Sequence, residues 1–292
     1  MKRETFTAIV NPAAGAGSAA ATMITLARAL RESGAWVRVT YSRGLKHATE
    51  LAAAAAARGE TVLAAGGDGM AGAVAAGLVG TDAELGVVPA GRGNDLARAV
   101  PLPRDDPAAF AAALRQHPSR PVDVAMAGER VVLGSVCAGL DAAANAAANR
   151  WRLPRRPIAY QIAAAGVLAR WRPVTYDLIV DGEPQRLVGN TVVVANCAWY
   201  GGALRVAPAA RLDDGFLDLV TIGEMGRRRL VPVLAAMRRG EHVTMPGIAS
   251  RPVREVTIAT DRPTPFYADG EPLPPGPATV TVRPGALRLI GA

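Results

Sequence analysis

Hydrophobic positions in the first part of the chain form short runs that alternate with helical patterns. Short apolar runs bounded by turn residues are typical of buried strands, and apolar residues three or four apart are typical of amphipathic helices. The expected strands are residues 6–10, 36–41, 61–65, 85–88 and 122–126, and the expected helices are residues 18–32, 46–58 and 72–78. This alternation predicts a parallel, doubly wound α/β domain over residues 1–127.

The pattern changes after residue 127, where strand-like runs come in pairs separated by Asp-Gly and Pro-Gly turns. The expected strands are residues 130–136, 175–180, 185–196, 216–222, 253–260 and 278–282, and helices are expected within 141–171 and 227–238. Paired strands of this kind predict an antiparallel β-sandwich over residues 128–282. We expect residues 283–292 to pack back onto the first domain.

Composition changes this picture only a little. A chain of 292 residues suits two domains, and its 4% aromatic content requires a core of Ala, Val, Leu and Ile. The formal net charge of +8 has two readings. It reflects either a GC-rich genome that favours Arg and Ala, or a basic face that meets anionic phosphates.

The expected compartment is a reducing one. Cys137 and Cys197 show no pairing pattern and are expected to be buried thiols. No apolar signal core follows the first basic residues, and the most apolar helical candidate, residues 158–169, is shorter than the roughly 20 residues of a membrane span. We expect a cytoplasmic protein that associates with membranes at most peripherally.

The strongest chemical signal is Gly66-Gly67-Asp68-Gly69, which follows the third expected strand and precedes a helix. Ligands of parallel sheets bind beyond the carboxyl ends of the strands, and glycines there let the backbone approach a phosphate. The helix N-terminus offers free N–H groups. Asp68 would repel a phosphate unless a cation lies between them, which makes it a candidate magnesium partner. The alternative is a tight turn that merely needs glycine.

Two further strands end in similar loops. Residues 89–96 contain Gly91, Arg92, Asn94 and Asp95, and residues 11–17 begin with Asn11-Pro12. Arg92 could reach a nucleotide phosphate, whereas Asn94 or Asp95 could simply cap the following helix. Three such loops at one edge of a sheet predict a single site. No Walker lysine motif is present, and the spacing does not match a dinucleotide fingerprint.

The ordered set of motifs resembles the diacylglycerol kinase catalytic-domain family, whose lipid kinases include sphingosine and ceramide kinases. The matching pieces are Asn11-Pro12-x-x-Gly15, Thr40, Gly66-Gly67-Asp68-Gly69, Pro89-x-Gly91-x-x-Asn94-Asp95, Asp123, residues 212–218 and Asp269-Gly270-Glu271-Pro272. They span nearly the whole chain in the family's order and are closest to its soluble bacterial branch. The resemblance implies an NAD-kinase-like α/β domain followed by a β-sandwich, with ATP and Mg²⁺ as cofactors.

The resemblance also implies roles for individual residues. Those expected around ATP are Asn11, Thr40, Gly66, Gly67, Asp68, Gly69, Met70, Gly91, Arg92, Asn94 and Asp95. Glu271 is expected to be the base that accepts the proton of the substrate hydroxyl, with Asp68 as a second catalytic carboxylate. Asp214 with the carbonyls of Arg211 and Phe216 resembles the family's structural magnesium site, and Asp123 is expected near the catalytic metal. A plain hairpin turn is the alternative for both Glu271 and Asp214.

Three positions depart from the family's pattern. Met70 stands where the family usually has Thr or Ser, Arg92 where it often has Thr, and Ala16 where it often has Lys. These changes remove a hydroxyl and add a guanidinium near the expected triphosphate, so they predict a shifted nucleotide pose, another lipid or weaker activity.

The expected function is transfer of the γ-phosphate of ATP to a lipid hydroxyl, with diacylglycerol as the first substrate to test. The alternatives are a kinase of a soluble acceptor, similar to NAD kinase, and a weakened protein that binds lipid or nucleotide. Residues 150–156 are basic and contain Trp151, so they could bind anionic lipid headgroups, or they could form a solvated loop. No recognition motif for nucleic acid accompanies the charge. An exposed sheet edge could pair two copies.

Overall fold

The computed structural model of the protein describes residues 2–91, 93–150 and 165–292. The segment with Trp151 and most of the basic stretch that follows Arg150 therefore lies outside the described residues, as does Arg92. Contacts between Cα atoms divide the chain into two compact units. Unit 1 contains residues 1–124, 212–214 and 283–292, and unit 2 contains residues 125–211 and 215–282.

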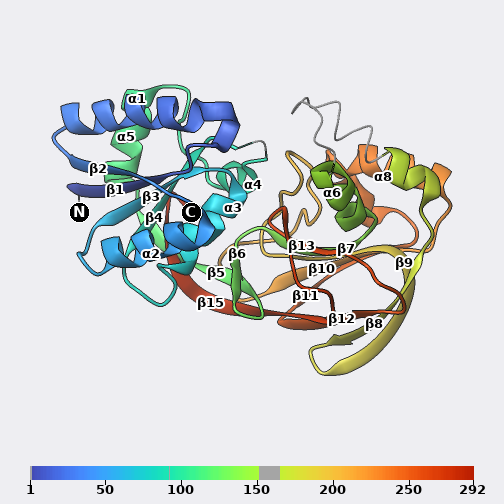
Figure 1. Ribbon diagram of the computed structural model, residues 1–292. Helices are drawn as coiled ribbons and strands as arrows, with labels where there is room; N and C mark the ends of the chain where they lie inside the picture. Colours follow the sequence, from blue (N-terminus) through green and yellow to red (C-terminus); the bar gives the residue numbers. More distant parts are fainter. Residues whose placement is uncertain (1, 92, 151–164) are drawn as a thin grey trace. The chain divides into compact units, whose positions relative to one another are not determined.

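Unit 1 is built on parallel strands in the order β4-β3-β1-β2 (Figure 1). Their bounds are β1 (Thr5–Val10), β2 (Trp36–Tyr41), β3 (Thr61–Gly66) and β4 (Glu84–Pro89). The last residues of β15 (Ala278–Ile290) pair with β4 in parallel, and β5 (Ser119–Ala127) pairs with β15. The expected parallel sheet is therefore present. Residues 283–292, which we expected to pack on the first domain, belong to this unit.

Helices cover both faces of this sheet. They are α1 (Ser18–Glu32), α2 (Leu45–Ala56), α3 (Asp68–Ala76), α4 (Asp95–Ala99) and α5 (Pro107–Gln116), with a short 3₁₀ turn η1 (Ala14–Gly17) before α1. In Figure 1, α1 and α5 lie on one face and α2 and α3 on the other. The helices pack closely because their inward positions are small: the buried residues of α2 are all alanines.

Helix α5 is a feature that the sequence reading did not predict. It begins at Pro107, a residue whose fixed φ suits the first helical position. The Asp106 carboxylate accepts hydrogen bonds from the amides of Ala108 (3.0 Å) and Ala109 (3.3 Å), so it caps the helix. The sequence does contain a signal for this helix: the pair Asp106-Pro107 precedes a run of apolar residues.

Unit 2 is an antiparallel sheet in the order β14-β13-β7-β9-β8-β12-β15, with β10 pairing β9 and β11. The strands are β6 (Arg130–Val132), β7 (Ser135–Gly139), β8 (Val174–Val180), β9 (Glu183–Ala195), β10 (Leu217–Gly223), β11 (Ile248–Val253), β12 (Glu255–Thr260), β13 (Phe266–Ala268) and β14 (Glu271–Pro272). Helices α6 (Leu140–Arg150) and α8 (Arg227–Met237) and the 3₁₀ turn η2 (Glu241–Thr244) lie between strands.

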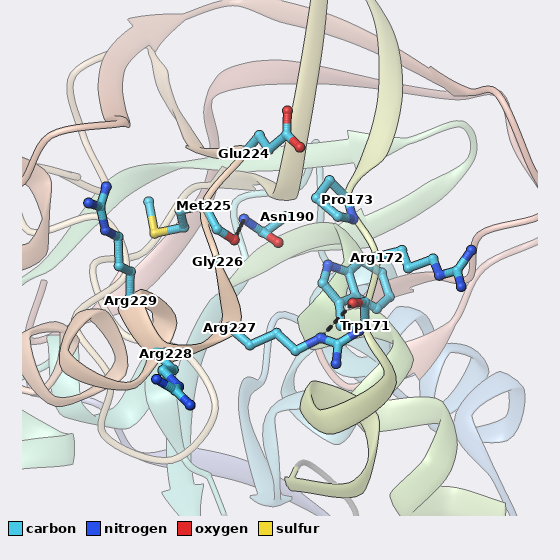
Figure 2. Close-up of a pocket in the computed structure, with 10 residues that line it drawn as sticks. All are labelled: Trp171, Arg172, Pro173, Asn190, Glu224, Met225, Gly226, Arg227, Arg228 and Arg229. Atoms are coloured by element: carbon cyan, nitrogen blue, oxygen red, sulfur yellow. Dashed lines mark hydrogen bonds between the residues drawn. The ribbon is translucent and has the colours of Figure 1, made fainter.

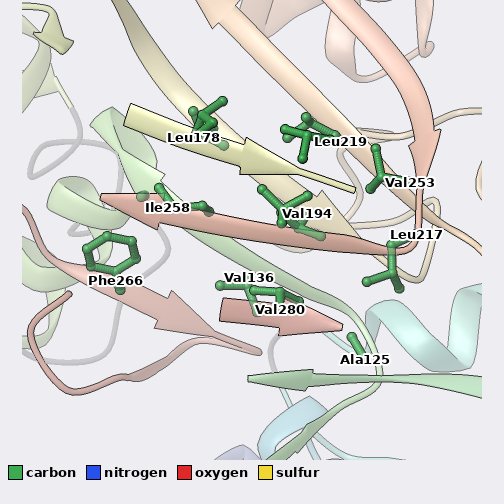
Figure 3. Packing of buried hydrophobic residues seen from close by; sticks show 14 of the residues in the cluster. Ala125, Val136, Leu178, Val194, Leu217, Leu219, Val253, Ile258, Phe266 and Val280 are labelled. Atoms are coloured by element: carbon green, nitrogen blue, oxygen red, sulfur yellow. The ribbon is translucent and has the colours of Figure 1, made fainter. Parts of the chain in front are cut away.

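Two apolar cores give this sheet its sandwich form. One core gathers side chains of β7, β8, β9, β10 and β12, as Figure 3 shows for Leu178, Val194 and Ile258. The other packs α8 on the opposite face of β9 and β10. Successive residues of β9 alternate between them: Val194 lies in the first core and Val193 in the second. The expected β-sandwich is therefore formed by strands buried on both faces.

Three expected strands differ from the structure by a split or a long extension, beyond shifts of a few residues at other strand ends. The run 130–136 is split into β6 and β7 because the amides of Leu133 and Gly134 donate to the Asp269 carboxylate (both 2.9 Å). The run 253–260 is split at Arg254, whose amide donates to Asp181 (2.8 Å). The run 278–282 continues to Ile290. In the first two cases a carboxylate replaces a neighbouring strand as the acceptor for backbone N–H groups.

The two cysteines are buried free thiols, as expected. Among the described residues, none of the helices has the length and apolar character that crossing a membrane requires.

Candidate active site

Three loops meet at the carboxyl edge of the unit 1 sheet, after β1, β3 and β4. The amide of Ala90 donates to the carbonyl of Gly66 (2.8 Å), and the amide of Asn11 donates to the carbonyl of Ala65 (3.0 Å). These bonds continue the strand pairing past the ends of the strands, so the loops start side by side. The structure therefore brings together the three loops that the sequence predicted to form one site.

Glycine is required where these loops touch. A Cβ atom on Gly91 would lie 2.4 Å from the Cα of Gly67, a distance at which the backbone would have to move. In the loop after β1, Gly15 has φ of +57°, and a Cβ there would lie 2.6 Å from the carbonyl oxygen of Ala90. The glycines thus let the loops approach each other backbone to backbone, and glycine-rich loops can present N–H groups to a phosphate.

Asn94 closes the loop after β4. Its Oδ1 accepts from the amide of Gly91 (2.8 Å), and its Nδ2 donates to the carbonyl of Gly91 (2.9 Å). Its backbone is left-handed, with φ of 55°. Asn94 occupies the N-cap position of α4 without a side-chain capping bond, so the alternative that it caps the helix is wrong.

Asp68 supplies a bond that α4 does not receive from Asn94. The amide of Leu96, in the first turn of α4, donates to Asp68 Oδ1 (3.2 Å). Asp68 itself begins α3, directly after β3. One carboxylate oxygen thus fixes the position of α4, and a Cβ on Gly93 would lie 2.8 Å from the other, Oδ2. Asp68 therefore joins the loops after β3 and β4.

Met70 lies beneath this site and is only 3% exposed. A Cβ on Gly66 would lie 2.7 Å from the Cβ of Met70, and the buried Ser42 hydroxyl lies 4.0 Å from its sulfur. The amide of Met70 donates to the carbonyl of Gly67 (3.0 Å). Its side chain packs in the interior, and the sequence reading did not single out Ser42, its polar neighbour. Thr40 is half-buried near the end of β2, opposite Ile9 of β1.

Unit 2 contains Glu271, which is exposed at the start of β14 and pairs with Ala268 of β13. The preceding turn is held by Asp269, whose carboxylate accepts from the amides of Leu133 (2.9 Å), Gly134 (2.9 Å) and Ser135 (3.0 Å). Asp269 has φ of 49°, a conformation that Asp tolerates better than most residues. The turn that presents Glu271 is thus anchored to the β6–β7 connection.

The sequence reading treated Asp269 as part of a turn and of the family's Asp-Gly-Glu motif, without a contact of its own. An Asp-Gly pair signals a turn, but the three amide donors come from residues about 135 positions earlier, which no local pattern reveals.

The residues of the candidate structural magnesium site lie in the connection between β9 and β10. Asp214 and Arg211 are exposed, and Phe216 is half-buried beneath the guanidinium of Arg254 at 4.7 Å. Asp123 is 3% exposed on β5; its amide donates to the carbonyl of Leu212 (2.6 Å), and its carboxylate accepts from the amide of Gly285 (2.8 Å).

These bonds place Asp123 beside the 212–214 segment within unit 1. The available donors are carboxylate and carbonyl oxygens on a turn, which suit Mg²⁺. In the part of the chain that the structure describes, no group of three or more His, Cys, Asp or Glu side chains gathers as a metal cluster. A magnesium ion here would depend on backbone carbonyls and water for most of its ligands.

Comparison with known proteins identifies the family. Residues 5–127 match the diacylglycerol kinase catalytic domain, and residues 134–291 match the YegS C-terminal NAD kinase beta sandwich-like domain. A diacylglycerol kinase of Mycobacterium tuberculosis is 32% identical in an alignment of 292 positions. The alignment covers 97% of this chain and 94% of that protein. The chain belongs to the diacylglycerol kinase catalytic-domain family. It is accordingly a lipid kinase, an enzyme that transfers a phosphoryl group to a hydroxyl.

Other diacylglycerol kinases are similar to this chain in sequence or in fold. The enzyme of Bacillus subtilis is 26% identical over 215 residues, which cover 73% of this chain and 71% of that protein. A solved diacylglycerol kinase structure from Bacillus anthracis has a TM-score of 0.79 at 22% identity and covers 100% of this chain and 98% of that one. A second structure from that organism gives 0.81 at 20% identity. At these identities the likeness concerns the fold, and it confirms the expected α/β domain and β-sandwich.

Proposed function

We propose that this kinase transfers the γ-phosphoryl group of ATP to the free hydroxyl of diacylglycerol and so forms phosphatidic acid. The observation that supports it best is the close approach of Gly67 to Gly91, which brings two loops of the family's catalytic domain into backbone contact. The curated relatives from M. tuberculosis and B. subtilis are named diacylglycerol kinases.

The loops of unit 1 would hold the nucleotide phosphates. Backbone N–H groups of the glycine-rich loops would donate to phosphate oxygens, aided by the first turns of α1 and α3. Helix α1 has no acidic residue in its first turn and no side-chain cap, so its N-terminus can face an anion. Asn94 and Asp68 would keep the loops in place through the bonds that they already make.

Magnesium would be held by oxygen ligands of this chain. Asp214 with the carbonyls of Arg211 and Phe216 is the proposed structural site, and Asp68 and Asp123 are the proposed carboxylates near the nucleotide. The ion would supply charge neutralisation on the triphosphate when it is bound. Asp123 already fixes the 212–214 segment, so it would position Asp214.

Glu271 is the proposed general base. The diacylglycerol hydroxyl oxygen forms a bond to the γ-phosphorus as the bond to ADP breaks, and the hydroxyl proton passes to the Glu271 carboxylate. An exposed carboxylate on a turn anchored by three hydrogen bonds suits this role, since it is accessible and positioned.

The test is transfer of radiolabelled phosphate from γ-labelled ATP to diacylglycerol, monoacylglycerol, sphingosine or ceramide in mixed micelles. Glu271→Gln should lower kcat for the true acceptor by about 10²- to 10⁴-fold, the usual contribution of a general base, and leave the KM for ATP nearly unchanged. Glu183→Gln, a change at an exposed residue of β9, is the matched control.

Transfer to another of these lipids would replace diacylglycerol as the acceptor. Transfer only to a soluble acceptor such as NAD, or ATP binding without any transfer, would overturn the proposal in favour of the corresponding alternative. ATP binding without any transfer would make Met70, Arg92 and Ala16 the first residues to test by mutation, because the chain departs there from the family's pattern.

Because its proposed acceptor lies in a bilayer, the enzyme must reach a membrane surface. We propose peripheral association through basic residues and anionic lipid headgroups. Co-sedimentation with anionic and neutral vesicles tests this, and equal binding to both kinds would contradict it.

A further inference from the structure

Unit 2 contains a pocket of about 620 Å³ that the proposed reaction does not use (Figure 2). It is lined by residues 171–173 before β8, by Asn190 of β9, by residues 224–226 after β10 and by the first turn of α8. The sequence reading singled out none of these residues. Two features of the pocket point to a ligand: unpartnered polar atoms and a concentration of positive charge.

The first feature is the side chain of Asn190, which is 1% exposed. Its Nδ2 donates to the carbonyls of Gly223 (2.7 Å) and Met225 (3.4 Å), which fixes the orientation of the amide. Its Oδ1 has no hydrogen-bond partner. A buried acceptor without a partner costs about 1–3 kcal/mol, so a donor supplied by a ligand would be stabilising.

A second polar atom in the pocket lacks a partner as well. The indole Nε1 of Trp171 is buried and makes no hydrogen bond. Both side chains line the pocket, as Figure 2 shows. The Asn190 oxygen is an acceptor and the Trp171 indole nitrogen is a donor. A ligand hydroxyl within reach of both would satisfy both, because its oxygen can accept from Trp171 while its hydrogen is donated to Asn190.

The second feature is positive charge at the start of an uncapped helix. Helix α8 has 11 residues, begins with Arg227-Arg228-Arg229 and has no side-chain cap. Arg227 Nε donates to the carbonyl of Trp171 (3.1 Å), which holds its guanidinium at the pocket. Arg172 adds another positive charge and Glu224 one negative charge. Four guanidinium groups, one carboxylate and the N-terminus of a helix favour an anion.

We infer that this pocket binds a phosphate monoester in its singly protonated form. The non-bridging oxygens would accept from the arginines and from the first amides of α8, and the P–OH group would lie between Trp171 and Asn190. A phosphodiester has oxygens for the arginines but no P–OH hydrogen for Asn190. The site is separate from the proposed reaction, although phosphatidic acid, the proposed product, carries this group.

The test measures binding alone, so it does not depend on whether the chain phosphorylates diacylglycerol. Wild-type protein is titrated with phosphatidylcholine vesicles that contain phosphatidic acid, or phosphatidylmethanol, a phosphodiester lipid without a free hydroxyl, at matched surface charge. We expect about tenfold tighter binding to phosphatidic acid, the factor that one charge-assisted hydrogen bond supplies. Equal binding to both lipids would overturn the inference.

Three variants locate the effect. Arg228→Gln should weaken binding to phosphatidic acid vesicles several-fold. Trp171→Phe, which keeps the ring but removes the N–H, should reduce the preference over phosphatidylmethanol. Arg238→Gln makes the same charge change at the other end of α8 and should leave the preference intact. Thermal unfolding confirms that each variant is folded.

Several outcomes would overturn the inference. An equal loss in Arg228→Gln and Arg238→Gln would mean that only net charge matters. An unchanged preference in Trp171→Phe would mean that the two unpartnered atoms are bridged by water instead. If the preference is present, competition by glycerol 3-phosphate shows that the site also takes the soluble ester, and absence of competition restricts it to the lipid.

Discussion

At the scale of single residues, the site depends on positions where only one side chain fits. Gly67 and Gly91 are in contact because neither has a Cβ, and Asp269 holds three amides because its two carboxylate oxygens can accept them together. The sequence showed the glycines by their position after strands. It did not show what Asp269 contacts, since the contact partners lie far away in the chain.

Gly91→Ala should weaken ATP binding by at least about tenfold. The added Cβ would lie 2.4 Å from the Cα of Gly67, and the loops must separate, at a cost on the order of 1–3 kcal/mol. Calorimetric titration with ATP measures the change. Gly166→Ala is the matched control, because a Cβ there meets nothing within 4 Å. Unchanged affinity in Gly91→Ala would show that the loops do not hold the nucleotide.

Asp269→Asn should lower both stability and kcat. The variant loses the charge and one of the two acceptor oxygens that hold three amides, so we expect the free energy of unfolding to fall by roughly 1–3 kcal/mol. Because the turn presents Glu271, kcat should fall more than the KM for ATP rises. Urea unfolding and steady-state kinetics measure the two effects.

Asp181→Asn is the control for that experiment. Asp181 also precedes a glycine, also has positive φ (51°), and accepts from the amides of Arg254 (2.8 Å) and Glu255 (2.9 Å). The Asp181→Asn variant should be less stable than the wild type, but its kcat should stay close to the wild-type value. If both variants lose kcat equally, Asp269 has no positioning role.

At the scale of elements, the unit 1 strands are joined by one charged cluster. Glu84, at the start of β4, accepts from Arg3 Nη2 (2.8 Å), and it also bonds Arg3 Nε and the Ser119 hydroxyl of β5. Burial alone would raise the pKa of Glu84, but the hydrogen bonds from Arg3 and Ser119 outweigh burial and lower it. The cluster links the residues before β1 to β4 and β5.

The lowered pKa of Glu84 predicts acid-sensitive stability. A carboxyl group whose pKa is lower in the folded than in the unfolded state stabilises the fold above its unfolded pKa of about 4.3, and this contribution is lost as the pH falls through the folded pKa. Glu84→Gln should therefore reduce stability at pH 7 and flatten the decline below about pH 4.5. Thermal unfolding between pH 3 and 7, with Glu183→Gln as the control, checks this; parallel curves for wild type and Glu84→Gln would contradict it.

At the scale of the whole molecule, neither unit is one continuous stretch of chain. Unit 1 takes up residues 212–214 and 283–292 after the chain has passed through unit 2. In the last segment, Leu287, Leu289 and Ile290 are buried, and Leu289 pairs with Leu85 of β4. The sequence predicted that residues 283–292 would pack on the first domain, but it placed residues 212–214 in the second.

A fragment of residues 1–127 should therefore be much less stable than the intact protein. It lacks three buried aliphatic side chains, each of which contributes about 1.5–3 kcal/mol, and the sum approaches the whole stability of an ordinary domain. Joining residues 283–292 through a flexible linker should restore folding. Circular dichroism with urea unfolding measures this, and the same segment with Leu287→Ser and Leu289→Ser is the control. A stable, cooperative 1–127 fragment would contradict the prediction.

The sequence by itself determined the fold class, the family and the position of the three glycine-containing loops after β1, β3 and β4. These follow from local information: apolar periodicity, glycines directly after strands, and motifs that occur in a fixed order. Tertiary structure alone decided that Asp68 bonds Leu96, that Asp269 holds the turn before Glu271, and that Asn190 and Trp171 line one pocket with the first turn of α8. Each of these joins residues distant in the chain, and only folding gives polar groups such partners or leaves them without one.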